Sequence, residues 1–159
     1  MGLTLEFYVG NIDVLSRAFE RGEVNFDLLS VFSQAGNCAD LSLHLEIQDL
    51  EILSEKAAKM AQNPPIYLRD SIEQIIADET DYGAILISQS WVEQFFAIPI
   101  WASQDLTARW FRTMGQNHGT TLEVNSAAEK AIESLIRICK QATKNSESIV
   151  LFWLGSSLF

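Results

Sequence analysis

Alternating apolar and polar residues mark the strands that this chain is expected to form. The two-residue period of a half-buried strand runs through residues 3–9 and again through 41–46. Two uninterrupted apolar runs, 84–87 and 149–154, are typical of strands buried on both faces. The pattern therefore predicts a small sheet of about four to five strands, with the run at 149–154 in its interior.

Helices are predicted where apolar residues recur three and four positions apart. The strongest such stripe runs through 126–144, where charged residues occupy the opposite face and Ser126 precedes Glu129 at the spacing of a capping box. Weaker stripes predict further helices at 12–21, 26–34, 47–60, 69–78, 90–98 and 103–114. The prediction is one domain of residues 1–159, α+β or α/β in class, in which helices cover the sheet and a long helix precedes a buried final strand.

The order strand, helix, helix occurs three times, starting near residues 3, 41 and 84. Equal spacing of similar units is the mark of an internal repeat. The three segments share no residue motif, however, and connections of a few residues are the commonest kind between strands and helices. Ordinary alternation is therefore the favoured interpretation.

Negative charge is concentrated in the first half of the chain. The 159 residues carry a formal net charge of -10, from 21 acidic and 11 basic side chains. Residues 1–82 contain 15 of the acidic and five of the basic side chains, and residues 83–159 contain six of each. Nucleic acids and anionic membrane surfaces need clustered lysine and arginine, so neither is expected as a partner. The acidic first half is expected to steer a basic protein partner instead.

Membrane insertion, export and metal binding have no signal in the sequence. The longest apolar run, 149–154, is far shorter than the roughly 20 residues that span a bilayer. No secretory leader is recognisable in the first residues, and Cys38 and Cys139 have no neighbour at metal-ligand or redox spacing. We therefore expect a cytoplasmic protein with reduced, structural thiols and with no metal or cofactor.

One histidine stands in a pattern that is compatible with acid–base chemistry. If the second alternating segment forms a strand, Ser42, His44 and Glu46 share one face. A histidine beside a carboxylate can act as an oriented general base, as a small hydrolase would require. The alternative, which we favour, is that these residues form the solvent-facing side of an amphipathic strand. The second histidine, His118, falls in an expected polar loop.

Aromatic residues crowd into one stretch of the second half. They are Trp91, Phe95, Phe96, Trp101, Trp110 and Phe111. Core packing is the favoured role, because each aromatic side chain can bury about 150–250 Å². The alternatives are a pocket for a small apolar ligand and a protein interface. The candidate contact residues are Trp91, Trp101 and Trp110 with the neighbouring Arg109.

Clear fold signals combined with absent catalytic motifs predict a small protein-interaction or regulatory module without catalysis. It would bind another protein, or a second copy of itself, through its acidic first half or its aromatic second half. A small hydrolase using His44 with Glu46 is one alternative. A carrier of a small apolar ligand in the tryptophan-rich region is the other.

Overall fold

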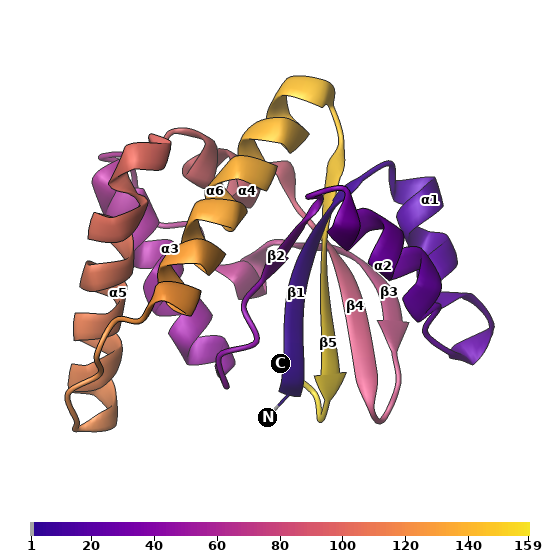
Figure 1. Cartoon of the computed structure of the whole chain (residues 1–159), viewed down its shortest axis with the longest axis horizontal. Coiled ribbons are helices and arrows are strands. Elements are labelled where there is room, and N and C mark those ends of the chain that lie inside the picture. The colour runs from indigo at the N-terminus through magenta and orange to yellow at the C-terminus, as the bar shows by residue number, and fades with distance from the viewer. Residues whose placement is uncertain (1) are drawn as a thin grey trace.

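The fold is a five-stranded antiparallel sheet with helices on both faces (Figure 1). The computed structural model describes residues 2–159, without the side chains of residues 2, 3 and 21. The strands are β1 (Gly2–Gly10), β2 (Cys38–Asp40), β3 (Ile72–Asp78), β4 (Tyr82–Ile87) and β5 (Ser148–Gly155). They lie in the order β2-β1-β5-β4-β3, and each neighbouring pair is antiparallel. The class is therefore α+β and not the parallel α/β alternative.

Two helical layers enclose the sheet (Figure 1). One contains α3 (Ile47–Met60), α4 (Gln89–Phe96), α5 (Ser103–His118) and α6 (Ser126–Asn145), and the other contains α1 (Ile12–Ser16) and α2 (Phe26–Gln34). Short 3-10 turns extend or connect them, namely η1 (Arg17–Gly22), η2 (Leu68–Asp70) and η3 (Ile100–Ala102). Over residues 2–159, no helix is long and apolar enough to cross a membrane.

The centre of the sheet is β5, as its apolar run predicted. It pairs with β1 on one side and with β4 on the other. Because successive side chains of a strand point to opposite faces, β5 supplies two cores. Ile149, Leu151 and Trp153 join the larger core under α3–α6, and Val150 and Phe152 join the smaller core under α1 and α2. These five residues are at most 4% exposed, so the strand is buried on both faces.

The long helix α6 confirms its prediction, although its cap differs from the expected one. The Asn125 side chain caps the helix by accepting the Ala128 N–H at 2.8 Å, and Ser126 is already helical. The apolar stripe of α6 is buried in the larger core. The helix ends at Asn145, and its C-cap residue Ser146 has a left-handed backbone with φ 53°.

The helix predicted at 69–78 is wrong, because this segment contains strand β3. Its isoleucines have helical spacing, but the segment pairs with β4 in a hairpin whose turn is closed by the Glu79 N–H donating to the Tyr82 carbonyl at 2.9 Å. Two register shifts interrupt the pairing, and Ile75 is 61% exposed instead of buried. The second unit of the chain is therefore not strand, helix, helix, and the repeat hypothesis loses its support.

The strand predicted at 41–46 is misplaced, because pairing with β1 covers Cys38–Asp40 and ends there. The Asp40 carboxylate accepts the Ser42 N–H at 3.0 Å, which turns the chain. The Ser42 hydroxyl then accepts the Leu5 N–H at 3.0 Å. The Ser42 side chain thus accepts the Leu5 N–H in place of a backbone carbonyl of the β2–β1 ladder, and the strand ends.

Helix α5 is longer than predicted, because Gly115 does not end it. The helix continues to His118, and Gly119 follows with φ 69° as its left-handed cap. Gly115 lies inside the helix, where an added Cβ would meet the Thr120 carbonyl oxygen at 2.6 Å. Its missing side chain lets the following loop fold back against the helix. The predicted helix at 12–21 is shorter than expected, since α1 gives way to η1 after Ser16.

Candidate functional site

Three of the four tryptophans belong to the core. Trp91 and Trp110 are fully buried, and Trp153 is 4% exposed. The Trp91 indole N–H donates to Ser54 Oγ at 3.0 Å, and the Trp110 indole N–H donates to the Asp49 carbonyl at 2.8 Å. These polar atoms are satisfied inside the protein, so the two predicted contact residues Trp91 and Trp110 are not available to a partner at the surface.

Trp101 differs from the other tryptophans because it is 84% exposed. It lies in η3, a turn that is fixed by the Ala102 N–H donating to the Pro99 carbonyl at 3.0 Å. Phe96, at the end of α4, is also partly exposed. Lys140 Nζ lies 5.3 Å from the centre of the Phe96 ring and donates to the Phe96 carbonyl at 2.7 Å. The segment 96–101 thus exposes the Trp101 ring and leaves the Phe96 ring partly exposed beside a cation.

Helices α3 and α5 form a groove that is rich in cations, which we call the α3–α5 groove. Its volume is about 460 Å³. Its lining includes Lys56 and Lys59 of α3 and Arg109 and Arg112 of α5. Asp105, one helical turn beyond Trp101, also lines it and forms an ion pair with Arg109, with 3.1 Å between Oδ2 and Nε. The α5 side of the groove therefore starts one helical turn after Trp101, which is not itself part of the lining, and the predicted contact residue Arg109 lies in the groove.

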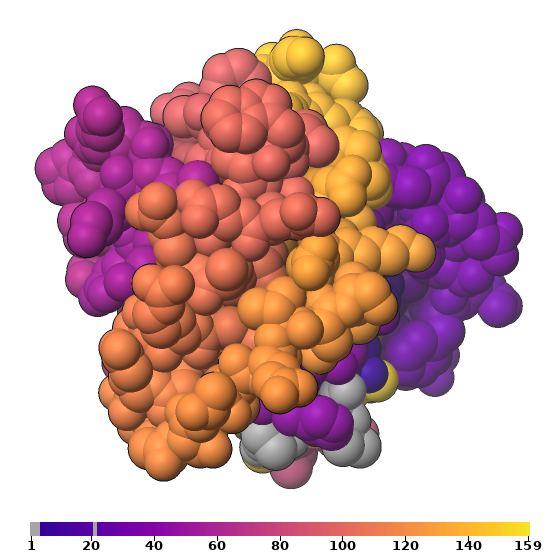
Figure 2. Space-filling view, turned by 60° about the vertical axis from the view of Figure 1, so that its left-hand side comes forward, coloured from indigo at the N-terminus to yellow at the C-terminus, as the bar shows by residue number. Residues whose placement is uncertain are grey.

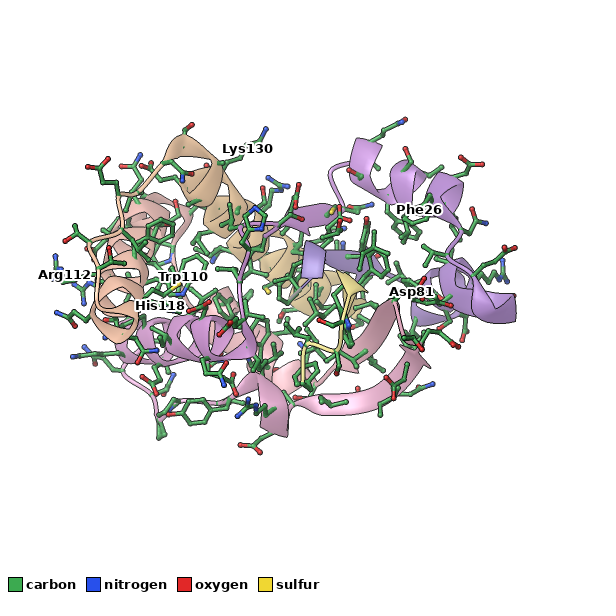
Figure 3. The ribbon with its side chains drawn as sticks, turned by 90° about the horizontal axis from the view of Figure 1, so that it is seen from below. Phe26, Asp81, Trp110, Arg112, His118 and Lys130 are labelled. Carbon is green, nitrogen blue, oxygen red and sulfur yellow. The ribbon has the colours of Figure 1, made fainter. Side chains whose placement is uncertain are left out.

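The other end of the molecule is acidic. Figure 3 shows Phe26 and Asp81 at the end away from Arg112 and His118. A cavity of about 570 Å³ lies beside Phe26, and its lining includes Arg17, Glu20, Glu23 and Asp27. The first half is not acidic throughout, because its Lys56 and Lys59 on α3 join Arg109 and Arg112 of α5 in the α3–α5 groove.

A histidine–carboxylate pair joins α5 to α3. His118 Nε2 lies 2.9 Å from Asp49 Oδ1, and Asp49 Oδ2 accepts the Glu46 N–H at 2.9 Å. The Asp49 side chain is only 5% exposed, whereas that of His118 is 43% exposed. The hydrogen bond to Asp49, followed by the negative charge of Asp49, raises the pKa of His118 above its ordinary value. Sequence reasoning misses this pair, because only the packing of α3 against α5 brings the two residues together.

The pair has the form of an oriented base, but no nucleophile accompanies it. Among the described side chains, no hydroxyl or thiol is hydrogen-bonded to His118. Burial raises the pKa of Cys38 to about 12 and also raises the pKa of Cys139, so both thiols are protonated in the folded protein at neutral pH. The described residues contain no group of three histidine, cysteine or acidic side chains that could hold a metal ion. In the described residues the pair bridges helices α3 and α5.

The three residues predicted to share a strand face are placed in different settings. The Ser42 hydroxyl is bonded to the Leu5 backbone. His44 is exposed and has φ 60° in the bend that follows β2. Glu46 caps α3, and its N–H donates to Asp49. No hydrogen bond in the described part of the chain joins His44 to Glu46, so the structure does not form the oriented base that the strand prediction required.

Comparisons of the chain with protein-family models, with curated proteins and with solved structures found no match. The architecture alone therefore defines its class: an α+β domain with five antiparallel strands between two helical layers.

Proposed function

We propose that the protein is an interaction module that binds a protein partner through Trp101. The observation that carries the proposal is the 84% exposure of this tryptophan on a hydrogen-bonded turn. A tryptophan can bury about 150–250 Å² of surface, and tryptophan is enriched among the residues that dominate binding energy in protein interfaces.

The turn that carries Trp101 favours binding because its backbone is already fixed. Pro99 precedes it, the Ala102 N–H closes it, and α5 begins directly after it at Ser103. A partner would have to immobilise the Trp101 side chain but not the chain around it. Fixing one such side chain costs about 0.5–1.5 kcal/mol, which leaves most of the gain from burial available for affinity.

The charges near Trp101 favour a partner with an apolar pocket and an acidic rim. The α3–α5 groove presents Lys56, Lys59 and Arg112 to such a rim. The acidic end of the molecule, which contains Glu20 and Glu23, would repel the same partner and turn it toward the groove. We therefore expect the association rate to fall as salt concentration rises.

The test compares Trp101→Ala with Phe26→Ala, which removes an aromatic side chain of 56% exposure at the acidic end. Wild type and both variants are used to capture proteins from native lysate, and the affinity of each captured protein is then measured with purified components. We expect to find a partner that binds wild type and Phe26→Ala with equal affinity. The same partner should bind Trp101→Ala about tenfold more weakly or worse.

Circular dichroism and urea unfolding of each variant control for loss of fold. The proposal is wrong if every captured protein binds Trp101→Ala as tightly as it binds wild type. It is equally wrong if only Phe26→Ala loses binding, because the interface would then lie at the acidic end.

A further inference from the structure

The sheet has two outer strands, β2 and β3, and they differ in how their free edges are protected. Outer strands carry unpaired backbone groups that can template pairing with another chain, and bulges are a common defence. Register shifts interrupt β3 twice along its pairing with β4. The pairing of β2 with β1 is regular over all three residues, from Tyr8 opposite Cys38 to Glu6 opposite Asp40. The free edge of β2 therefore lacks the bulges that disturb β3.

Backbone groups of β2 point outward at alternate residues. The Val9 N–H donates to the Asn37 carbonyl at 3.0 Å, and the Leu41 N–H donates to the Leu5 carbonyl at 2.8 Å. In an antiparallel ladder only every second residue bonds to a given neighbour, so residues 37, 39 and 41 face β1. The N–H and C=O groups of Cys38 and Asp40 consequently point away from β1, toward the free edge.

A groove lies along this edge, and we call it the β2 groove. It has a volume of about 460 Å³. Its lining includes Cys38, Asp40 and Ser42 from β2 and the following bend, Ser33 and Gly36 from the end of α2, and Lys130, Ser134 and Arg137 from α6. Figure 2 shows a recess between α6, in orange, and the purple α2 side of the molecule. An extended chain segment could lie in this groove with its backbone against β2.

The α6 wall of the β2 groove is basic. Lys130 and Arg137 are both exposed, and neither forms a salt bridge with a carboxylate in the described part of the chain. Arg137 Nη2 donates instead to the Gly36 carbonyl at 3.3 Å, so it reaches across the groove. Asp40 lies on the β2 side and would repel a second acid placed there.

We propose that the β2 groove binds an extended acidic peptide, which adds to the sheet as a sixth strand beside β2. The Cys38 and Asp40 backbone groups would bond to the backbone of the peptide, as in known cases of strand addition. Successive side chains of the peptide would point alternately toward α6 and toward Asp40. Acidic residues therefore occupy the positions that face Lys130 and Arg137, and uncharged residues occupy the positions between them. This site is separate from the Trp101 surface and does not depend on it.

The probe is a fluorescent peptide of alternating glutamate and valine, and its binding to the full chain is measured by anisotropy. Amide hydrogen exchange, followed by NMR, reports on Cys38 and Asp40 directly. We expect the peptide to slow exchange at these two amides. We also expect Arg137→Ala to weaken binding by about tenfold or more, whereas Lys144→Ala, on the same helix outside the groove lining, leaves it unchanged.

Two further comparisons separate strand addition from simple charge attraction. Cys38→Pro removes one outward N–H, and Cys38→Ala keeps it, so only the proline variant should lose affinity, provided that circular dichroism shows both folded. A peptide methylated on the alternate backbone nitrogens that would face β2 should not bind, and neither should a lysine–valine peptide. The proposal is overturned if the methylated peptide binds as well as the unmodified one. It is also overturned if the glutamate–valine peptide leaves exchange at Cys38 and Asp40 unchanged.

Discussion

His118 connects parts of the chain that are 69 residues apart. It lies in the last turn of α5, and Asp49 lies in the first turn of α3. The helix dipole favours a cation at the C-terminal end of a helix, where His118 lies, and an anion at the N-terminal end, where Asp49 lies. Trp110 binds the backbone carbonyl of the same aspartate. Asp49 therefore holds α5 through both its side chain and its backbone, although nothing in the local sequence distinguishes it from other acids near helix starts.

Protonation of His118 should stabilise the folded protein. Folding raises the pKa of His118 above the ordinary value of 6.5, first through the hydrogen bond to Asp49 and then through the charge of Asp49. A group whose pKa rises on folding contributes stability that is complete below the unfolded pKa and is lost as pH rises through the folded pKa. The free energy of unfolding should therefore fall across the upper part of the range from about pH 5 to 8, and it should fall less in His118→Gln.

Urea unfolding at a series of pH values measures this slope. Glu46, whose charge also acts on His118, is retained in the variant. The matched control is His44→Gln, since His44 is the other histidine and is exposed. Equal slopes in wild type and His118→Gln would show that the pair contributes nothing to pH-dependent stability.

Trp101 should dominate the quenching of tryptophan fluorescence. The other three tryptophans are at most 4% exposed, so a soluble quencher such as acrylamide reaches them poorly. We expect Trp101→Phe to remove most of the quenchable emission and to change the free energy of unfolding by less than about 0.5 kcal/mol, as is usual at the surface. Trp110→Phe, the control, should leave quenching intact. It should cost about 1–3 kcal/mol, because the Asp49 carbonyl loses the indole N–H as a partner and the smaller ring leaves a cavity in the core. Unchanged quenching in Trp101→Phe would contradict the exposed position.

Helices and strands are predicted best from the sequence where the spacing of apolar residues fits only one of the two structures. Helix α6 and strand β5 have such patterns, and both are found where they were expected. The isoleucines of β3 fit a helix and a strand equally well, and only pairing with β4 decides between them. Tertiary contacts likewise decide the candidate sites. Trp101 and Trp110 are the same residue type in one aromatic cluster, yet packing buries one and exposes the other.

The pairing of β4 with β5 depends on the absence of a side chain at Gly83. Gly83 lies opposite Trp153, and an added Cβ would overlap the Trp153 ring. We expect Gly83→Ala to lower the free energy of unfolding by about 1–3 kcal/mol through overpacking. In a Trp153→Ala background the same change should cost much less, because the clashing ring is gone. Denaturant titration of the four proteins gives this double-mutant cycle, and additive effects would argue against the contact.

For the molecule as a whole, the sheet separates two cores, and each core contains or contacts one free thiol. Cys139 is fully buried in the larger core, and Cys38 is partly buried beside the smaller one. The smaller core is covered by only the short helices α1 and α2, so fewer packed helices have to move to open it. Local opening of one layer can expose a residue without unfolding the rest of the protein.

Iodoacetamide should therefore modify Cys38 faster than Cys139 in the wild-type protein. Peptide mass spectrometry measures the two rates. Modification of Cys139 should require global unfolding, so its rate should rise about tenfold for each 1.4 kcal/mol of destabilisation in a variant such as Gly83→Ala. The rate at Cys38 should respond less to the same variant. Equal rates at the two thiols would show that the two layers open together.

The central place of β5 also governs the order in which the sheet can be completed. β1 pairs with β2 on one side and β3 pairs with β4 on the other, and only β5 joins the two pairs. Because synthesis runs from the N-terminus, β5 leaves the ribosome after the other four strands. Any half-sheet that forms before then, from β1 and β2 or from β3 and β4, has an inner edge, β1 or β4, that is open to pairing with other chains. During synthesis this protein thus has an aggregation hazard at two edges that no longer exist once β5 is in place.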